Sequence, residues 1–335
     1  MSQKFRILSL DGGGLRGIIP VLILKEIERR TGKRITDTFD MVAGTSTGAL
    51  IACGITVSDD GKNPKYNLEA IEKIYTERGK DIFPKKNWFS GVVSGISSLK
   101  NPKFMPDGLQ KVLEELLGEK RIADCMKPIF VTTFDLYNNE ALLFKSRQAL
   151  REANRNARLI DICRATSAAP TYLPAYNFMY NEKKRVCVDG GIYMNNPAVG
   201  ALVEVTKYHK ETPYNFQELS LNDISVLSIG TGHYSSEIAR KKVEGFGLLD
   251  WATNITDVMM QAVNQTTTYQ TEEFVSDGNF LRINLDIDDP KYSDMADSAD
   301  ETREYLIRMV NSQIISNSVL MAQLDKFLNT NNPIA

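Results

Sequence analysis

Apolar runs that end in glycine-rich turns recur along the chain and predict alternating strands and helices. Residues 5–10 form a short apolar run that stops at Asp11-Gly12-Gly13-Gly14, and residues 18–27 follow with apolar positions at helical spacing. Residues 41–43 and 49–55 repeat the order of buried strand, turn and apolar helix. Buried strands followed by helices indicate a mainly parallel sheet covered on both faces. The sequence therefore predicts an α/β protein.

The pattern continues to the C-terminus. We expect further strands at 129–134, 141–144, 185–188, 224–229 and 280–283, and helices near 67–79, 107–117, 159–168, 194–208 and 302–328. Ser298-Ala299-Asp300-Glu301 has the form of a capping box before the last helix. Since neither a linker nor an internal repeat interrupts the chain, we expect one domain over 1–335 with a helical cover at 296–328.

Segment 82–106 breaks the periodic pattern with several prolines and glycines, so we predict an insertion there. Trp88 and Phe89, beside Lys85 and Lys86, fit an amphipathic lid that touches a lipid surface, with the rings at the interface and the lysines toward headgroups. A loop packed on its own core explains the same residues equally well.

Composition and charge narrow the function. The chain has 335 residues with 40 Lys and Arg against 42 Asp and Glu, so no overall positive charge favours binding to a nucleic acid polymer. The N-terminus lacks the features of a secretory signal, and the four cysteines lack zinc-site spacing. The acidic stretch 286–301 lacks the ligand order of an EF-hand. We therefore expect a cytoplasmic protein without a metal.

The turn Gly44-Thr45-Ser46-Thr47-Gly48 carries the candidate nucleophile. A G-x-S-x-G corner between strand and helix lifts the serine onto a strained turn, and its glycines let the two elements approach closely. Since glycine and serine are common, the pentapeptide also fits an ordinary tight turn with a solvated serine. A catalytic Ser46 needs a base and an oxyanion site elsewhere in the chain.

Residues 11–17, Asp-Gly-Gly-Gly-Leu-Arg-Gly, present nearly bare backbone amides before a helix. Such a loop binds negative charge. One interpretation is an oxyanion hole built from Gly12, Gly13, Gly14, Arg16 and Gly17. The alternative is a nucleotide-binding regulatory protein in which the loop holds a phosphate and Ser46 is structural. The loop formally fits a dinucleotide fingerprint, although the acidic residue that should end the next strand is missing.

The base has two competing interpretations. A Ser-His-Asp esterase must use His209 or His233, the only histidines, and the order Ser46, Asp189, His233 fits such a triad. Alternatively Asp189, which a buried strand places on a turn with Gly190 and Gly191, takes the proton itself. A carboxylate with an ordinary pKa of about 3.9 is a weak base, so this dyad requires strong oxyanion stabilisation.

Taken together, residues 11–17, 44–48 and 189–191 resemble the patatin-like phospholipase family, and matches at 39–40, 165–170, 195–197 and 228–232 extend the resemblance. It implies a three-layer α/β/α fold with the catalytic motifs within 7–232, a Ser46–Asp189 dyad, and an oxyanion hole in the 12–17 loop. It also implies hydrolysis of phospholipid acyl esters through an acyl-enzyme, without a cofactor and with transient membrane contact. Because the family includes bacterial effectors of phage defence, a small-nucleotide activator is a further expectation.

Overall fold

The computed structural model describes residues 4–84, 102–234, 245 and 247–330. The strands are β1 (Phe5–Leu10), β2 (Met41–Thr45), β3 (Ile129–Asp135), β4 (Glu140–Lys145), β5 (Tyr176–Tyr180), β6 (Lys183–Asp189), β7 (Ile224–Ile229), β8 (His233–Tyr234), β9 (Phe280–Ile283) and β10 (Asp286–Ile287). The longer helices are α1 (Ile18–Thr31), α3 (Thr47–Thr56), α4 (Leu68–Thr76), α6 (Asp107–Leu117), α8 (Leu159–Thr166), α10 (Ala198–Tyr208), α12 (Leu248–Phe274), α13 (Asp300–Met309) and α14 (Ser318–Thr330). Shorter helices are η1 (Gly14–Gly17), α2 (Ile35–Thr38), α5 (Gly79–Ile82), α7 (Ser146–Arg151) and α9 (Gly191–Met194).

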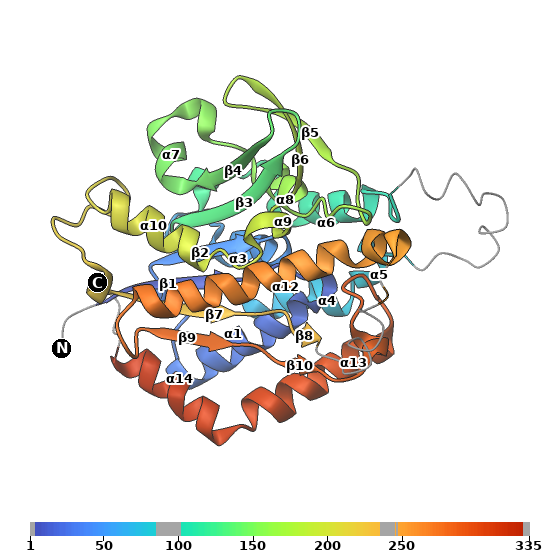
Figure 1. The fold of residues 1–335 in the computed structure, drawn as a ribbon. Helices are drawn as coiled ribbons and strands as arrows, with labels where there is room; N and C mark the ends of the chain where they lie inside the picture. The colour runs from blue at the N-terminus through green and yellow to red at the C-terminus, as the bar shows by residue number, and fades with distance from the viewer. Residues whose placement is uncertain (1–3, 85–101, 235–244, 246, 331–335) are drawn as a thin grey trace.

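An eight-stranded sheet forms the middle layer (Figure 1). Its strand order is β5-β6-β3-β2-β1-β7-β9, and β4 pairs with β3 outside this order. Strands β3, β2, β1, β7 and β9 pair in parallel, whereas β4, β6 and β5 form antiparallel pairs at one end. The expected mainly parallel sheet is confirmed, and the antiparallel end is an addition that the apolar pattern did not predict.

The two faces of the sheet bury separate apolar clusters. Leu8 and Leu10 of β1 pack with residues of α1, α3 and the C-terminal helices, whereas Phe5 and Ile7 pack with α10. Alternate residues of a strand point to opposite faces, so both sets lie below 4% exposed. Helix α12 crosses the molecule on the side of α10 and α9 (Figure 1). Helices thus cover both faces, as the expected α/β/α fold requires.

The C-terminal cover differs from the prediction of one helix over 302–328. Helix α13 passes into a π-helical stretch, Val310–Ile315, and α14 begins only at Ser318. The predicted capping box is also wrong. Ser298 donates its hydroxyl to the Phe83 carbonyl, and the N-cap residue of α13 is Ala299, which has no side-chain acceptor. Tertiary contact with Phe83 thus outcompetes local capping.

Helix α12, with 27 residues, and strand β5 were not predicted. Residues 266–268 of α12 are three consecutive threonines, and β-branched residues disfavour a helix when only local propensity counts. Packing against α9 and α10 supplies the stabilisation that propensity lacks. Within the described ranges, no helix combines the length and the apolar character needed to cross a bilayer.

Candidate active site

Ser46 occupies a strained turn between β2 and α3. Its backbone has φ 53° and ψ −122°, a conformation that residues other than glycine rarely adopt. A Cβ on Gly44 would lie 2.4 Å from the Gly48 carbonyl oxygen, and one on Gly48 would lie 2.2 Å from the Leu10 carbonyl oxygen. Both glycines are therefore required for the close approach of strand and helix, as the motif predicted. Thr45 and Thr47 flank the serine and bond to Thr132 and Tyr75.

Strand β3 brings Ser46 and Asp189 together. Strand β4 occupies one edge of β3 over 130–135. Strands β2 and β6 pair with β3 over 129–132 and 133–135, so they share the opposite edge. Thr45 at the end of β2 pairs with Thr132, and Asp189 at the end of the antiparallel β6 pairs with Thr133. The two strands therefore meet end to end. This arrangement places residues 46 and 189 side by side, despite their separation in sequence.

Asp189 is a buried carboxyl group, 4% exposed. Burial raises its pKa to about 6, while the Gly191 amide and the Ser46 hydroxyl, which hydrogen-bond to the carboxylate, limit the rise. The Gly191 amide donates to Oδ1 at 2.7 Å. A Cβ on Gly190 would lie 2.1 Å from the Thr132 hydroxyl, so the turn of Gly190 and Gly191 follows β3 closely. A carboxylate with this pKa is a stronger base than an ordinary aspartate and is still ionised at pH 7.

The backbone amides of the glycine loop differ in whether they already donate a hydrogen bond within the protein. The Gly12 amide donates to the Asn195 carbonyl, and the Leu15 amide donates to the Met295 carbonyl. The amides of Gly13 and Gly14 donate to no acceptor within the parts of the chain that the structure describes. Gly14 and Ser46 line the same cavity. Among the residues predicted to form the oxyanion hole, Gly13 and Gly14 therefore remain as candidate amide donors, because the Gly12 amide is already hydrogen-bonded to Asn195.

Arg16 and Gly17 have other surroundings than the sequence suggested. The Arg16 guanidinium donates to the Ser293 carbonyl at 3.1 Å and lines a neighbouring cleft rather than the cavity beside Ser46. A Cβ on Gly17 would lie 2.3 Å from the Thr47 hydroxyl, so Gly17 permits close packing of the loop against the elbow. A part for Arg16 in oxyanion binding stays a prediction.

Neither histidine ring is hydrogen-bonded to Ser46 or Asp189 in the described ranges. The His209 ring contacts the Thr206 carbonyl at the end of α10. His233 lies on β8, where its backbone amide donates to the Leu285 carbonyl. The hydrogen bonds that affect the Asp189 pKa come from Gly191 and Ser46. The geometry thus favours the dyad over the triad.

Ser46 is one of the residues that line a small, mostly apolar cavity. Its wall is formed largely by aliphatic and aromatic side chains, including Leu15, Leu50, Ile74, Ile82, Phe83, Leu109, Tyr172, Leu173 and Met295. Such a cavity suits the hydrocarbon chain of an acyl group. Phe83 and Phe104, whose rings are 4.9 Å apart, lie at either end of the predicted insertion. The lid residues themselves, 85–93, lie outside the described residues.

Buried threonines hold the nucleophile and the base, and sequence reasoning assigned them no function. The Thr166 hydroxyl accepts the Ser46 amide at 2.8 Å and donates to the Thr132 carbonyl at 2.6 Å. The Thr133 hydroxyl donates to the Val188 carbonyl at 2.7 Å, beside Asp189. The available signal was the polar pair Thr132-Thr133 inside an otherwise apolar strand.

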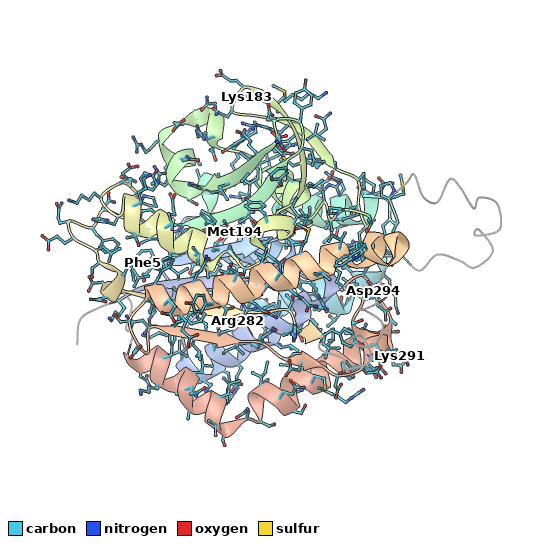
Figure 2. The ribbon with its side chains drawn as sticks, in the orientation of Figure 1. Phe5, Lys183, Met194, Arg282, Lys291 and Asp294 are labelled. Atoms are coloured by element: carbon cyan, nitrogen blue, oxygen red, sulfur yellow. The ribbon has the colours of Figure 1, made fainter. Side chains whose placement is uncertain are left out.

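The glycine loop is also anchored from the C-terminal part of the chain. The Arg282 guanidinium on β9 forms two hydrogen bonds to the buried Asp11 carboxylate, one of them 2.9 Å long, and a third to the Ser228 hydroxyl. Figure 2 shows Arg282 and Met194 on opposite sides of α12 in that view. The Asp11 amide donates to the Ile229 carbonyl. Hydrogen bonds therefore hold both the backbone amide and the side-chain carboxylate of Asp11, the residue directly before the glycines of the loop.

Comparisons with known proteins identify the family of the chain. The sequence profile of patatin-like phospholipase matches residues 8–202. Patatin-like protein 2 of Arabidopsis thaliana is 32% identical, with 97% of this chain and 86% of the relative covered. Patatin-like protein 1 of Oryza sativa subsp. indica is 32% identical, covering 92% and 80%, and Patatin-04/09 of Solanum tuberosum is 27% identical, covering 92% and 83%. The chain belongs to the patatin-like phospholipase family, which is a family of lipid acyl hydrolases.

Proposed function

We propose that this protein hydrolyses acyl esters of phospholipids with Ser46 as nucleophile and Asp189 as base. The observation that carries the proposal is the contact between the strained Ser46, which lines an apolar cavity, and a buried carboxylate with a raised pKa. Burial keeps the carboxylate a better base than a solvated aspartate. The amides of Gly13 and Gly14 donate to no other group within the described ranges. They stabilise the negative charge of the oxyanion, which a mechanism with a carboxylate base requires.

The reaction has two stages. Ser46 Oγ attacks the acyl carbonyl carbon while Asp189 takes the hydroxyl proton, and the amides of Gly13 and Gly14 bind the oxyanion. When the tetrahedral intermediate collapses, the ester bond breaks and Asp189 returns the proton to the leaving alcohol. Water then attacks the acyl-enzyme, Asp189 takes one proton from it, and collapse of the second intermediate releases the fatty acid as Ser46 regains its proton.

Contact with a membrane surface through 82–106 is a further part of the proposal. Phe83 and Tyr172 belong to the cavity wall, and Phe104 packs against Phe83 with its ring stacked 6.5 Å from that of Tyr172. The insertion thus leaves and rejoins the described chain beside the cavity. Deletion of 86–101 should reduce hydrolysis of phospholipid vesicles more than hydrolysis of a soluble short-chain ester. Equal losses on both substrates would contradict this part.

Activation by a small nucleotide stays a prediction without a defined site. The rival nucleotide-phosphate interpretation of the glycine loop is disfavoured, because Met295 accepts the Leu15 amide and β2 ends in Thr45 rather than in an acidic residue. The purified protein should be assayed with and without cyclic nucleotides. Equal activity in both conditions would remove the activator from the proposal.

The test of the proposed function is fatty acid release from a phospholipid panel by the wild type and four variants. Ser46→Ala and Asp189→Asn should abolish release, whereas His209→Ala and His233→Ala should retain it. Loss of activity in His233→Ala with the fold intact would restore the triad. Full activity in Ser46→Ala would reject a serine mechanism at this site altogether.

A further inference from the structure

Asn195 lies between the two halves of the active site. It is 2% exposed and belongs to the turn after α9, directly beyond the Asp189 turn. Its carboxamide oxygen lies 2.4 Å from the position of a Cβ on Gly12 and 2.9 Å from that of a Cβ on Gly191. The carboxamide therefore fills the space that side chains on these two glycines would need. One glycine begins the oxyanion loop, and the other donates its amide to the Asp189 carboxylate.

Hydrogen bonds hold Gly12 from both sides. The Gly12 amide donates to the Asn195 carbonyl at 3.2 Å, and the Gly12 carbonyl accepts from Asn195 Nδ2 at 3.3 Å and from the Thr231 hydroxyl at 2.6 Å. With both polar groups of Gly12 fixed, the peptide planes that follow are constrained. These planes carry the amides of Gly13 and Gly14, the proposed oxyanion donors.

Asn264 on α12 completes the arrangement. Asn195 Nδ2 also donates to Asn264 Oδ1 at 3.1 Å, which orients the carboxamide. Met260, one turn earlier on α12, lies 3.2 Å from the position of a Cβ on Gly191. Residue 264 lies outside the stretch 8–202 that matches the family profile. The positioning of the loop thus extends to a helix that the family's motifs do not contain.

The Asn195 carboxamide oxygen has no hydrogen-bond partner within the described ranges, although it is buried. A buried unsatisfied acceptor is unfavourable for folding. Unfavourable local arrangements of this kind concentrate at functional sites.

We propose that Asn195 is a positioning residue that sets the spacing of the oxyanion loop and the Asp189 turn, and that Asn264 acts through it. This inference rests on the proposed function, because it assigns a task within the same reaction. Within the described ranges, the Asn195 side chain forms no hydrogen bond to Ser46 or Asp189. Its effect on the rate arises from holding Gly12 and Gly191 at a fixed separation.

The test uses a soluble short-chain p-nitrophenyl ester with the full chain. Asn195→Ala should lower kcat about 100-fold, the loss that a displacement of about 1 Å can cause, with KM changed by less than about threefold. Its melting temperature should stay within about 2 °C of wild type, because the lost hydrogen bonds are offset by removal of the unsatisfied oxygen. Asn279→Ala is the matched control: Asn279 is buried and donates to the Asn222 carbonyl, so this variant should lose stability and keep kcat.

Asn264→Ala should lower kcat about tenfold in the wild type and less than about twofold in the Asn195→Ala background, because coupled residues are not additive. Retention of more than a tenth of kcat in Asn195→Ala would overturn the inference, as would a kcat loss explained by unfolding. Additive losses would overturn the assignment of Asn264. Ser46→Ala is measured in the same series: hydrolysis that survives it rejects the proposed function, whereas hydrolysis lost there but kept in Asn195→Ala rejects only this inference.

Discussion

Replacing Asp189 by asparagine should stabilise the protein while it removes hydrolysis. In the folded protein the Asp189 pKa is about 6, raised mainly by burial from the ordinary value of 3.8. In the unfolded chain the carboxyl group ionises at lower pH, so ionisation favours the unfolded state wherever the pH exceeds 3.8. The penalty grows up to pH 6 and is then constant at about 3 kcal/mol, from roughly 1.4 kcal/mol per pKa unit. Asparagine carries no such penalty.

Urea unfolding of the wild type and Asp189→Asn at two pH values measures this effect. At pH 7.5 the variant should be more stable by up to about 3 kcal/mol, and at pH 4.5 the gain should shrink to about 1 kcal/mol. Asparagine has nearly the same shape and keeps an oxygen that can accept the Gly191 amide, so packing stays matched. A variant that is no more stable at pH 7.5, or whose gain is the same at both pH values, would refute the burial of an ionised Asp189.

Three other predictions follow from the same site. Ser46→Gly should be more stable than Ser46→Ala by about 1 kcal/mol in chemical denaturation, because glycine relieves the positive φ; equal stabilities would contradict the strain. For wild type, kcat/KM should rise with pH through about 6 as Asp189 ionises, and a profile flat between pH 5 and 7 would exclude it as the base. Leu173→Trp should fill the cavity and lower kcat/KM for long-chain more than for short-chain esters in a chain-length series, whereas equal losses would place the acyl chain elsewhere.

The parallel part of the fold could be predicted because each buried strand and each apolar helix has its own periodic signal. The glycine-rich turns were informative because their residue types repeat a known motif; the structure shows that Gly44 is required by a local contact with Gly48 and Gly48 by a long-range contact with the Leu10 carbonyl on β1. Helix α12 lacked such a signal, because tertiary packing rather than its own sequence stabilises it. Ser298 likewise bonds to Phe83, a residue distant in sequence, instead of capping α13.

The sequence indicates which residues make up the candidate site but not how they are arranged in space. Neither the pairing of β2 and β6 along one edge of β3 nor the commitment of the Gly12 amide to Asn195 has a local sequence signature. The same holds for the orientation of Arg16 toward Ser293. These features depend on contacts between segments far apart in the chain, which periodicity and spacing do not encode.

Identification of the covalent adduct formed by a fluorophosphonate probe tests the central claim most directly. We predict that peptide mass spectrometry finds the adduct on Ser46 in the wild type and in His209→Ala and His233→Ala, and that labelling is lost in Ser46→Ala and strongly slowed in Asp189→Asn. An adduct on another residue, or labelling that depends on His233 and not on Asp189, would contradict the Ser46–Asp189 dyad.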